Sequence, residues 1–188
     1  YGFERSMIDL VYPFLDKLNV LWLTSKVGPA HEKFVSNLIR RKLMCAIDKE
    51  QPGSLCDASC FLLYTPEHET QEMTLLFLHY LLRKRGQRVV YLGANTTLND
   101  LRDTCQTLHP DFIYTIIHEP LSRQSVQAYV EAAAQASIGG QLLLSGMQLF
   151  IKPIHLPPNA KILNGLPDTL QFLDDLKMRQ RNRGNVSN

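Results

Sequence analysis

The sequence predicts an α/β protein in which a small helical bundle precedes a five-stranded parallel sheet. Residues 1–51 carry apolar side chains at mostly helical spacing. From residue 60 onward, short apolar runs typical of strands alternate with segments typical of amphipathic helices. This alternation favours a doubly wound, flavodoxin-like (Rossmann-type) sheet with helices on both faces.

Two helices are predicted for the N-terminal bundle. The first covers 3–24, and Pro13 indicates a break or a start within it. The second runs from about 30 to 49, and Pro29 fits its first turn, where no backbone N–H is needed. Because neither helix can bury its apolar stripe alone, we expect a small bundle that packs on the following domain.

The clearest unit of the sheet is Cys60–Gly93, which reads as strand, polar loop, helix and strand. Cys60–Tyr64 is an uninterrupted apolar run, typical of a strand buried on both faces. A helix over about 70–85 ends in the basic segment LRKR followed by Gly86, a common pair of stop signals. A strand at 88–92 follows, and the helical crossover predicts a parallel, right-handed connection.

The rest of the chain repeats this alternation. Further strands are predicted at 112–117, 141–145 and 160–163, and further helices at about 97–108, 122–137 and 167–179. Phe150–Ala160 has too many prolines for a helix and is expected to be extended. The predicted domains are a bundle at 1–51, a linker at 52–59, an α/β domain at 60–180 and a polar tail at 181–188, which is either a frayed end or a phosphate-contacting arm.

Composition narrows the class of protein. Charges of both signs are spread along the 188 residues. The net charge of +2 therefore does not by itself indicate binding to nucleic acid or to a membrane. Four cysteines without a CxxC pair indicate reduced thiols in a cytoplasmic protein and argue against a zinc site. There is no signal peptide and no apolar run that would span a bilayer. Because the chain starts at Tyr1 rather than Met, we expect it to be a fragment of something longer.

The loop after the first strand is the first place to look for chemistry. It carries Glu67, His68, Glu69 and Gln71 at the carboxyl end of that strand, where open parallel sheets bind ligands. His118 follows the third strand, so His68 and His118 either share one crevice or are two exposed loop histidines. We find no dinucleotide fingerprint, Walker loop or GxSxG elbow, and no nucleophile–base pair, so no enzyme and no catalytic residue is predicted.

Other single residues have two interpretations each. Trp22 is either a core or interface anchor or a ring that stacks on a flat ligand. His79 lies on an apolar helix face and is expected in the core rather than as a ligand. Ser145 and Gly146 follow the fourth strand and would let a flat ligand approach the backbone closely. Asp111 opens a strand and is expected to cap it rather than to catalyse.

Two stretches together point to a family. LWLTSKVGPAHEKFVSNLIRRKL carries Trp22, nine further residues, and then Glu32 and Lys33, while Glu69 opens ETQEMT ahead of LLRKRG and YLG. These stretches resemble the cobalamin-binding sensor region of light-responsive MerR-type transcriptional regulators, whose motifs are Trp, nine residues and Glu-His, and then Glu-x-His-x-x-Gly. The resemblance covers nearly all of 1–178 and implies the architecture of a cobalamin-binding domain.

The sequence departs from these motifs at the positions that, in the family, bind cobalt and admit the nucleotide tail of cobalamin. By the resemblance, Gln71 stands where the family has the histidine that is its lower cobalt ligand. Lys33 stands where the family has the histidine that takes the other face of the cobalt. Thr74 stands where the family has the glycine that admits the nucleotide tail. An amide oxygen is a poor cobalt ligand, and an ammonium must first lose a proton. His68 would substitute for the lower ligand only if its loop shifted. The resemblance therefore implies a cobalamin-type pocket that is altered or empty, with cobalamin, another flat small molecule or nothing bound.

The pocket that the resemblance implies consists of residues from both halves of the chain, and it contains no metal ligand: Trp22, Glu32, Lys33, His68, Glu69, Gln71, Thr74, Thr115, Ser145 and Gly146. The implied function is the effector and oligomerisation region of a MerR-type regulator that forms homo-oligomers and contacts DNA through a domain absent from this chain. The alternative is the cobalamin-carrying domain of a corrinoid methyltransferase or mutase system. A winged helix upstream of Tyr1 would indicate the regulator.

Overall fold

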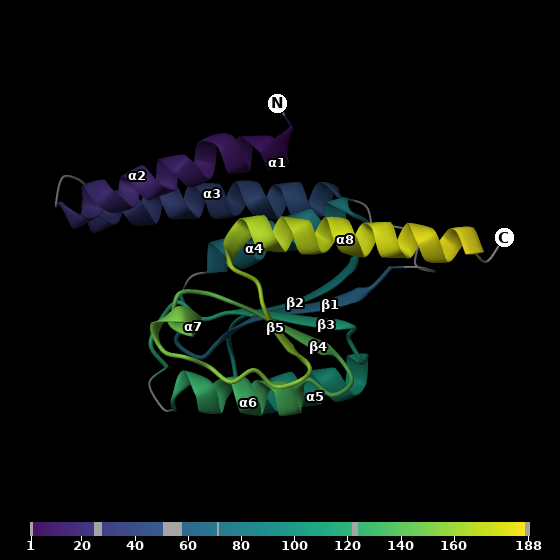
Figure 1. Ribbon diagram of the computed structural model, residues 1–188. Helices are drawn as coiled ribbons and strands as arrows, with labels where there is room; N and C mark the ends of the chain where they lie inside the picture. The colour runs from purple at the N-terminus through teal and green to yellow at the C-terminus, as the bar shows by residue number, and fades with distance from the viewer. Residues whose placement is uncertain (1, 25–27, 51–57, 71, 122–123, 187–188) are drawn as a thin grey trace. The chain divides into compact units, whose positions relative to one another are not determined.

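The computed structural model describes residues 2–24, 28–50, 58–70, 72–121 and 124–186, and its helices and strands are shown in Figure 1. The chain divides into two compact units, Tyr1–Glu50 and Gln51–Asn188. Most of the predicted linker at 52–59 lies outside the described residues. In the described part of the chain, no helix has both the length and the apolar character needed to cross a membrane.

The first unit is a pair of helical segments. Helix α1 (Phe3–Ser6), the π-helical turn η1 (Met7–Val11) and α2 (Tyr12–Leu23) form one continuous stretch, and α3 (Pro29–Lys49) follows. Pro13 lies in the first turn of α2, directly after the π-helical turn, so the proline accompanies a local change of helix type and not an interruption. Pro29 opens α3, as the sequence predicts.

Many large apolar side chains of this unit remain exposed, in line with the expectation that two helices cannot bury their stripes alone. They are Leu10, Phe14, Val20, Leu21, Trp22, Leu23, Phe34, Leu38 and Met44.

The second unit is built on a five-stranded parallel sheet with the order β2-β1-β3-β4-β5. The strands are β1 (Cys60–Pro66), β2 (Arg88–Thr96), β3 (Phe112–Ile116), β4 (Gln141–Ser145) and β5 (Ala160–Ile162). This is the flavodoxin-like order, and it confirms the predicted fold class. Every residue of β1 is buried, as expected for a central strand covered on both faces.

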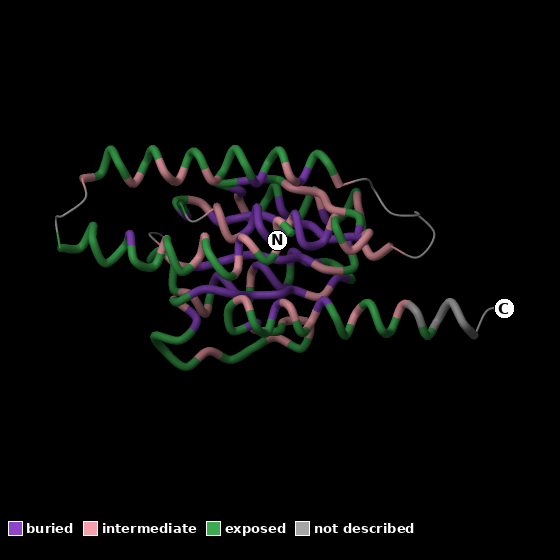
Figure 2. Tube along the Cα trace, turned by 90° about the horizontal axis from the view of Figure 1, so that it is seen from above, coloured by how far each residue is buried: buried purple, intermediate pink, exposed green. Residues whose placement is uncertain are grey.

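Helices cover both faces of the sheet. Helices α5 (Leu98–Leu108) and α6 (Val126–Ala136) lie on one face, while α4 (Glu72–Lys84) and α8 (Gly165–Val186) lie on the other (Figure 1). A short helix, α7 (Gln148–Ile151), follows β4. Figure 2 shows that the buried residues concentrate in the strands and in the helix sides that face them.

Two predicted local signals have the expected structure. Helix α4 ends at Lys84, and Gly86 just beyond it has a φ of 75°, the left-handed conformation that glycine adopts without strain. The N–H of Gln87 bonds the carbonyl of Leu82 at 3.0 Å. The carboxylate of Asp111 accepts the backbone N–H of Cys60 at 2.7 Å. Asp111 thus ties the starts of two neighbouring strands together.

Three elements differ from the sequence prediction. Strand β2 continues to Thr96, because a register irregularity near Gly93 lets it pair again with Pro66. The segment 150–160 was expected to be wholly extended, but its first two residues belong to α7, which buries Leu149 against the core. Helix α8 continues to Val186 and not to about 179, so most of the expected tail is helical.

Candidate functional site

One buried carboxylate joins two loops at the carboxyl edge of the sheet. Glu69, in the loop after β1, is only 3% exposed. Its Oε2 accepts the backbone N–H groups of His118 at 2.6 Å and Glu119 at 2.9 Å, both in the loop after β3. Hydrogen bonds to a charged acceptor are stronger than neutral ones. The predicted site residue Glu69 therefore holds the rim of the sheet together.

His118 extends this connection to the loop after β4. Its Nδ1 accepts the backbone N–H of Met147 at 3.3 Å, and its carbonyl oxygen accepts the side-chain amide of Gln148 at 3.1 Å. A neutral imidazole whose Nδ1 accepts a hydrogen bond carries its proton on Nε2. A histidine that binds a metal through Nε2 has the opposite arrangement, with Nδ1–H as a donor. In this geometry, His118 supports the loops and does not offer Nε2 to a metal.

Gly146 permits a close backbone approach, but the approaching group is part of the protein. Its φ is 116°, and an added Cβ would collide with the backbone of Ile117. Around it, the N–H of Ile117 bonds the carbonyl of Ser145 at 2.8 Å, and the N–H of Gln148 bonds the carbonyl of Ile117 at 3.1 Å. The glycine thus lets the ends of β3 and β4 pack together, and the space expected for a flat ligand is filled by Ile117.

A hollow of about 320 Å³ opens at the same edge, beside the ends of β1 and β2. Its described lining consists of Pro66, Glu67, His68, Thr96, Thr97, Leu98, Asn99, Leu121, Gln124 and Tyr129. These residues supply a carboxylate, an imidazole, hydroxyls and amides, but no lysine or arginine among the described ones.

The backbone beside this hollow is strained. His68 has a φ of 69° and Asn95 a φ of 59°, a region that non-glycine residues rarely adopt. The two are joined by a hydrogen bond of 2.9 Å from the N–H of His68 to the Oδ1 of Asn95. Strained conformations of this kind persist where the surrounding structure enforces them, and they cluster at functional sites.

Two buried hydroxyls lie beneath the hollow. Tyr129 in α6 donates its hydroxyl to that of Tyr64 in β1 at 3.0 Å. Burial raises the pKa of both phenols well above the ordinary value. Both groups therefore stay protonated near neutral pH and are unsuited to act as bases there.

Thr115 and Ser145 both belong to the pocket that the resemblance implies, and they lie on opposite faces of the sheet. Ser145 lies beside the phenol of Tyr114, which faces α8 and approaches Thr169 at 3.4 Å. Thr115 is the next residue after Tyr114 and lies beside Tyr64 on the α5 and α6 face. Burial raises the pKa of Tyr114, whose phenol lies on the same face of the sheet as Ser145.

The remaining predicted site residues are spread over the chain. His68, Glu69, Ser145 and Gly146 belong to the carboxyl edge, and Thr74 is half-buried in the first turn of α4. Three more belong to the first unit, where Trp22 is 43% exposed, Lys33 is exposed and Glu32 is half-buried. Gln71 lies outside the described residues.

His79 was expected to be a core residue. It is half-buried, and its ring stacks on Tyr91 with 5.6 Å between centroids, which is a packing arrangement.

Sequence reasoning missed several residues of the hollow. Thr96 and Thr97 come shortly after the YLG segment, and Tyr129 and Gln124 belong to or precede α6. The polar run at 95–97 was a usable signal, because it lies at the carboxyl end of β2, the strand next to β1.

In the described part of the chain, no group of three or more histidine, cysteine, aspartate or glutamate side chains is placed to hold a metal ion.

Comparisons with known proteins give one informative relative. No family model matches the chain. The chain is 25% identical to the HTH-type transcriptional repressor CarA of Myxococcus xanthus over 144 residues, which cover 77% of this chain and 48% of the repressor. The chain thus spans about half the length of this curated relative.

Two solved structures show a weaker likeness. A cobalamin-binding protein of Desulfitobacterium hafniense DCB-2 has 16% identity, with 88% of this chain and 76% of that one covered at a TM-score of 0.43. The anti-anti-sigma factor PhyR of Bartonella quintana has 13% identity, with 82% and 58% covered at a TM-score of 0.39. Both TM-scores are too low to support a conclusion about function.

Proposed function

We propose that this chain is the effector region of a transcriptional regulator. The observation that carries the proposal is its 25% identity to a helix-turn-helix repressor over 77% of the chain. Because the chain corresponds to only 48% of that repressor, the proposed DNA-binding part lies in a region that this chain does not include. In this proposal the regulator forms homo-oligomers through the effector region.

The proposed ligand site is the carboxyl edge of the sheet in the second unit. Open parallel sheets bind ligands beyond the carboxyl ends of their strands. Here Glu69 and His118 fasten three loops of that edge to one another, and the hollow beside His68 opens next to them. A rim that is held in place by such bonds supports a site that is preorganised before the ligand arrives.

Cobalamin is the ligand that the family resemblance implies, and we tested whether the described residues fit it. His118 presents the wrong nitrogen for cobalt, and the sequence has Gln71 and Lys33 where the family has histidines. Thr74 stands where the family has the glycine that admits the nucleotide tail, and it is half-buried in the first turn of α4. These residues do not fit a histidine-ligated cobalamin, so the proposed ligand is a flat molecule held by packing and hydrogen bonds.

We also propose that the chain has no catalytic activity of its own. Three buried polar groups of the site already have structural partners or stay protonated. Glu69 accepts two backbone N–H groups, and burial raises the pKa of Tyr64 and Tyr129.

The ligand part of the proposal is tested with adenosylcobalamin. The purified chain, mixed with an excess of the compound in the dark, is expected to elute colourless from gel filtration. A retained red band with the absorption spectrum of histidine-ligated cobalt would contradict the altered site.

A paired variant separates the missing imidazoles from the shape of the site. Gln71→His together with Lys33→His should raise adenosylcobalamin affinity, because both family ligands are restored. The matched control is Gln71→Asn with Lys33→Arg, which restores no imidazole and should bind no better than the parent. If both pairs behave alike, the obstacle is steric, with Thr74 as the first candidate.

The regulator part is tested separately, on the full-length protein from its host. Operator binding is measured for the intact protein and for a version without this chain, with and without the small-molecule fraction of the host. The intact protein should respond to that fraction, and the shortened one should not. An equal response in both would place the sensing function elsewhere.

A further inference from the structure

Basic side chains gather at the amino edge of the sheet, opposite the proposed ligand site. The described ones come from the end of α4, the start of β2, β5 and the second half of α8, and they are Arg83, Lys84, Arg85, Arg88, Lys161, Lys177 and Arg179. Three carboxylates share this edge: Asp111, Asp174 and Asp175. Seven cations and three carboxylates leave this edge with a net charge of +4, against +2 for the whole chain.

Two of the three carboxylates at this edge contact other groups of the chain. Asp174 pairs with Arg85 at 3.8 Å, and Asp111 accepts the backbone N–H of Cys60. Asp111 also lies close enough to Arg88 to help raise the pKa of that guanidinium, although the hydrogen bond to Cys60 is the larger cause. The Asp174–Arg85 pair therefore cancels locally, whereas Asp111 and Asp175 keep their charge and are outnumbered by the remaining cations of this edge.

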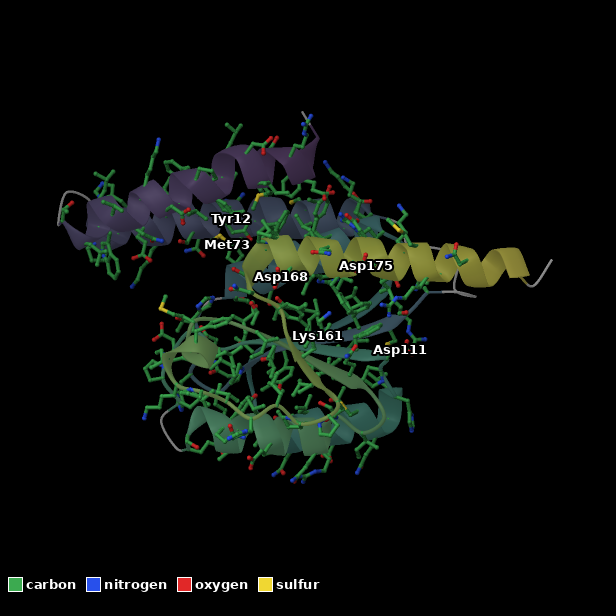
Figure 3. The ribbon with its side chains drawn as sticks, in the orientation of Figure 1. Tyr12, Met73, Asp111, Lys161, Asp168 and Asp175 are labelled. Carbon is green, nitrogen blue, oxygen red and sulfur yellow. The ribbon has the colours of Figure 1, made fainter. Side chains whose placement is uncertain are left out.

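A second hollow lies beneath α8 at this edge. It has a volume of about 250 Å³ and is lined by Phe112, Gln141, Lys161, Phe172, Asp175, Leu176 and Arg179. The Nζ of Lys161 lies 5.4 Å from the centre of the Phe172 ring, which holds the ammonium at the mouth of the hollow. In Figure 3, Lys161 lies on β5 below the helix that carries Asp175.

Long-range hydrogen bonds hold the basic part of α8 in place. The Gln180 amide exchanges hydrogen bonds with the Gln87 side chain at 3.0 and 3.1 Å, and it also donates to the hydroxyl of Ser59 at 3.1 Å. Beyond this anchor α8 continues past the sheet (Figure 1). The sequence adds Arg181 and Arg183 before the helix ends at Val186, and no carboxylate follows Asp175.

The helix dipole explains only part of this pattern. Cations in the last turn of a helix are favoured by the dipole, and Arg83 and Lys84 in α4 are examples. Lys177 and Arg179 lie well before the last turn of α8 and are both exposed. The dipole falls off within a turn, so their positions have no such explanation.

We infer that the amino edge, with the second half of α8, binds the phosphate backbone of duplex DNA without regard to sequence. Duplex DNA carries one charge per roughly 1.7 Å of its axis, and a helical stretch of about seven residues spans about 10 Å, which is several phosphates. A membrane surface fits less well, because a membrane-binding helix needs a continuous apolar face. After Leu176, the helix offers only Met178 and Val186.

The choice of DNA over RNA rests on the proposed function, whereas the electrostatic argument does not. The test measures fluorescence anisotropy of a labelled duplex of arbitrary sequence, about 30 base pairs long, with the 188-residue chain at about 50 and 150 mM salt. Binding should be weak, and it should fall steeply as the salt concentration rises.

The decisive variant is Lys177→Glu with Arg179→Glu. It should weaken DNA binding about tenfold at low salt and lower the salt slope by about 1.8, or about 0.9 for each phosphate that the variant no longer neutralises. The matched control is Arg102→Glu with Lys152→Glu, two exposed cations elsewhere in the same unit that give the same change of charge. The control should stay within about twofold of the parent.

Several outcomes would overturn the inference: equal losses in the two pairs, no salt-dependent binding, tighter binding to duplex RNA, or a stronger response to vesicles of anionic lipid. Circular dichroism of each variant checks that α8 is still formed. None of these measurements involves adenosylcobalamin or the response to host small molecules, so a failure here leaves the proposed function standing.

Discussion

At the scale of single residues, Glu69 is the group on which the rim of the sheet depends most. It is almost fully buried and accepts two backbone N–H groups from a loop 49 and 50 residues further along the chain. Buried donors that lose their acceptor cost about 1–3 kcal/mol each. The carboxylate therefore has a structural role that is separate from any contact with a ligand.

Glu69→Gln should lower the free energy of unfolding by about 1–3 kcal/mol, because the amide is a weaker acceptor and brings an N–H₂ group close to two other donors. Urea denaturation measures the change. Glu119→Gln, at an exposed position in the loop after β3, is the control and should change stability by less than about 0.5 kcal/mol. Equal effects would mean that the two hydrogen bonds of Glu69 add nothing beyond general charge.

At the scale of secondary-structure elements, the ends of β3 and β4 meet through a backbone contact that only glycine allows. The loop after β4 bends at Gly146 and packs directly on Ile117, the residue after β3. This contact brings α7 and its buried residue Leu149 against the core. A single position without a side chain thus sets the path of a whole connection.

Gly146→Ala should cost about 3 kcal/mol or more of stability, since a left-handed backbone and a collision with fixed backbone atoms add together. Gly139→Ala is a close control: its φ of 77° is also left-handed, but nothing lies within 4 Å of an added Cβ. That variant should cost only about 1–2 kcal/mol. If thermal and urea unfolding show equal losses for the two, the Ile117 contact is not tight.

At the scale of the whole molecule, burial of the Tyr64 and Tyr129 hydroxyls links global stability to alkaline pH. Their folded-state pKa values are raised above the ordinary value of 10, so in that range the folded protein binds protons that the unfolded chain has released. The stability that this provides is complete below pH 10 and is lost as the pH rises further.

Above about pH 10, stability should fall by up to about 1.4 kcal/mol per pH unit for each buried tyrosine. Urea unfolding curves between pH 8 and 11 measure this slope. Tyr64→Phe should make the slope shallower, while Tyr12→Phe, in the first unit, leaves both buried hydroxyls intact and should not. An unchanged slope in Tyr64→Phe would assign alkaline unfolding to other groups, such as Cys105, whose pKa burial raises to about 11.

The sequence was sufficient to predict the fold because its main signals are local. Apolar runs gave all five strands, and the basic segment before Gly86 marked the end of α4. The missed features depend on distant partners or on very short elements. Helix α7 has four residues and no periodicity to detect, and the extra length of α8 is accompanied by hydrogen bonds from Gln180 to Gln87 and Ser59.

The site was less predictable than the fold. Glu69 was a predicted site residue, but its partners are backbone groups that no side-chain pattern reveals. Gly146 was expected to leave space for a ligand, but the backbone of Ile117 occupies the space beside it. The face of the sheet on which Thr115 lies could have been predicted, because successive side chains of a strand point to opposite faces and Thr115 follows Tyr114.

The amide cluster of Gln180, Gln87 and Ser59 has a mechanical consequence. Its hydrogen bonds attach α8 to the turn that leads into the edge strand β2. The attachment point lies far along α8 from the start of that helix at Gly165. A pulling force applied at the C-terminus would therefore act first on these few hydrogen bonds between neutral groups. Helix α8 would then detach from its C-terminal end toward Gly165 before the force reached the strands of the sheet.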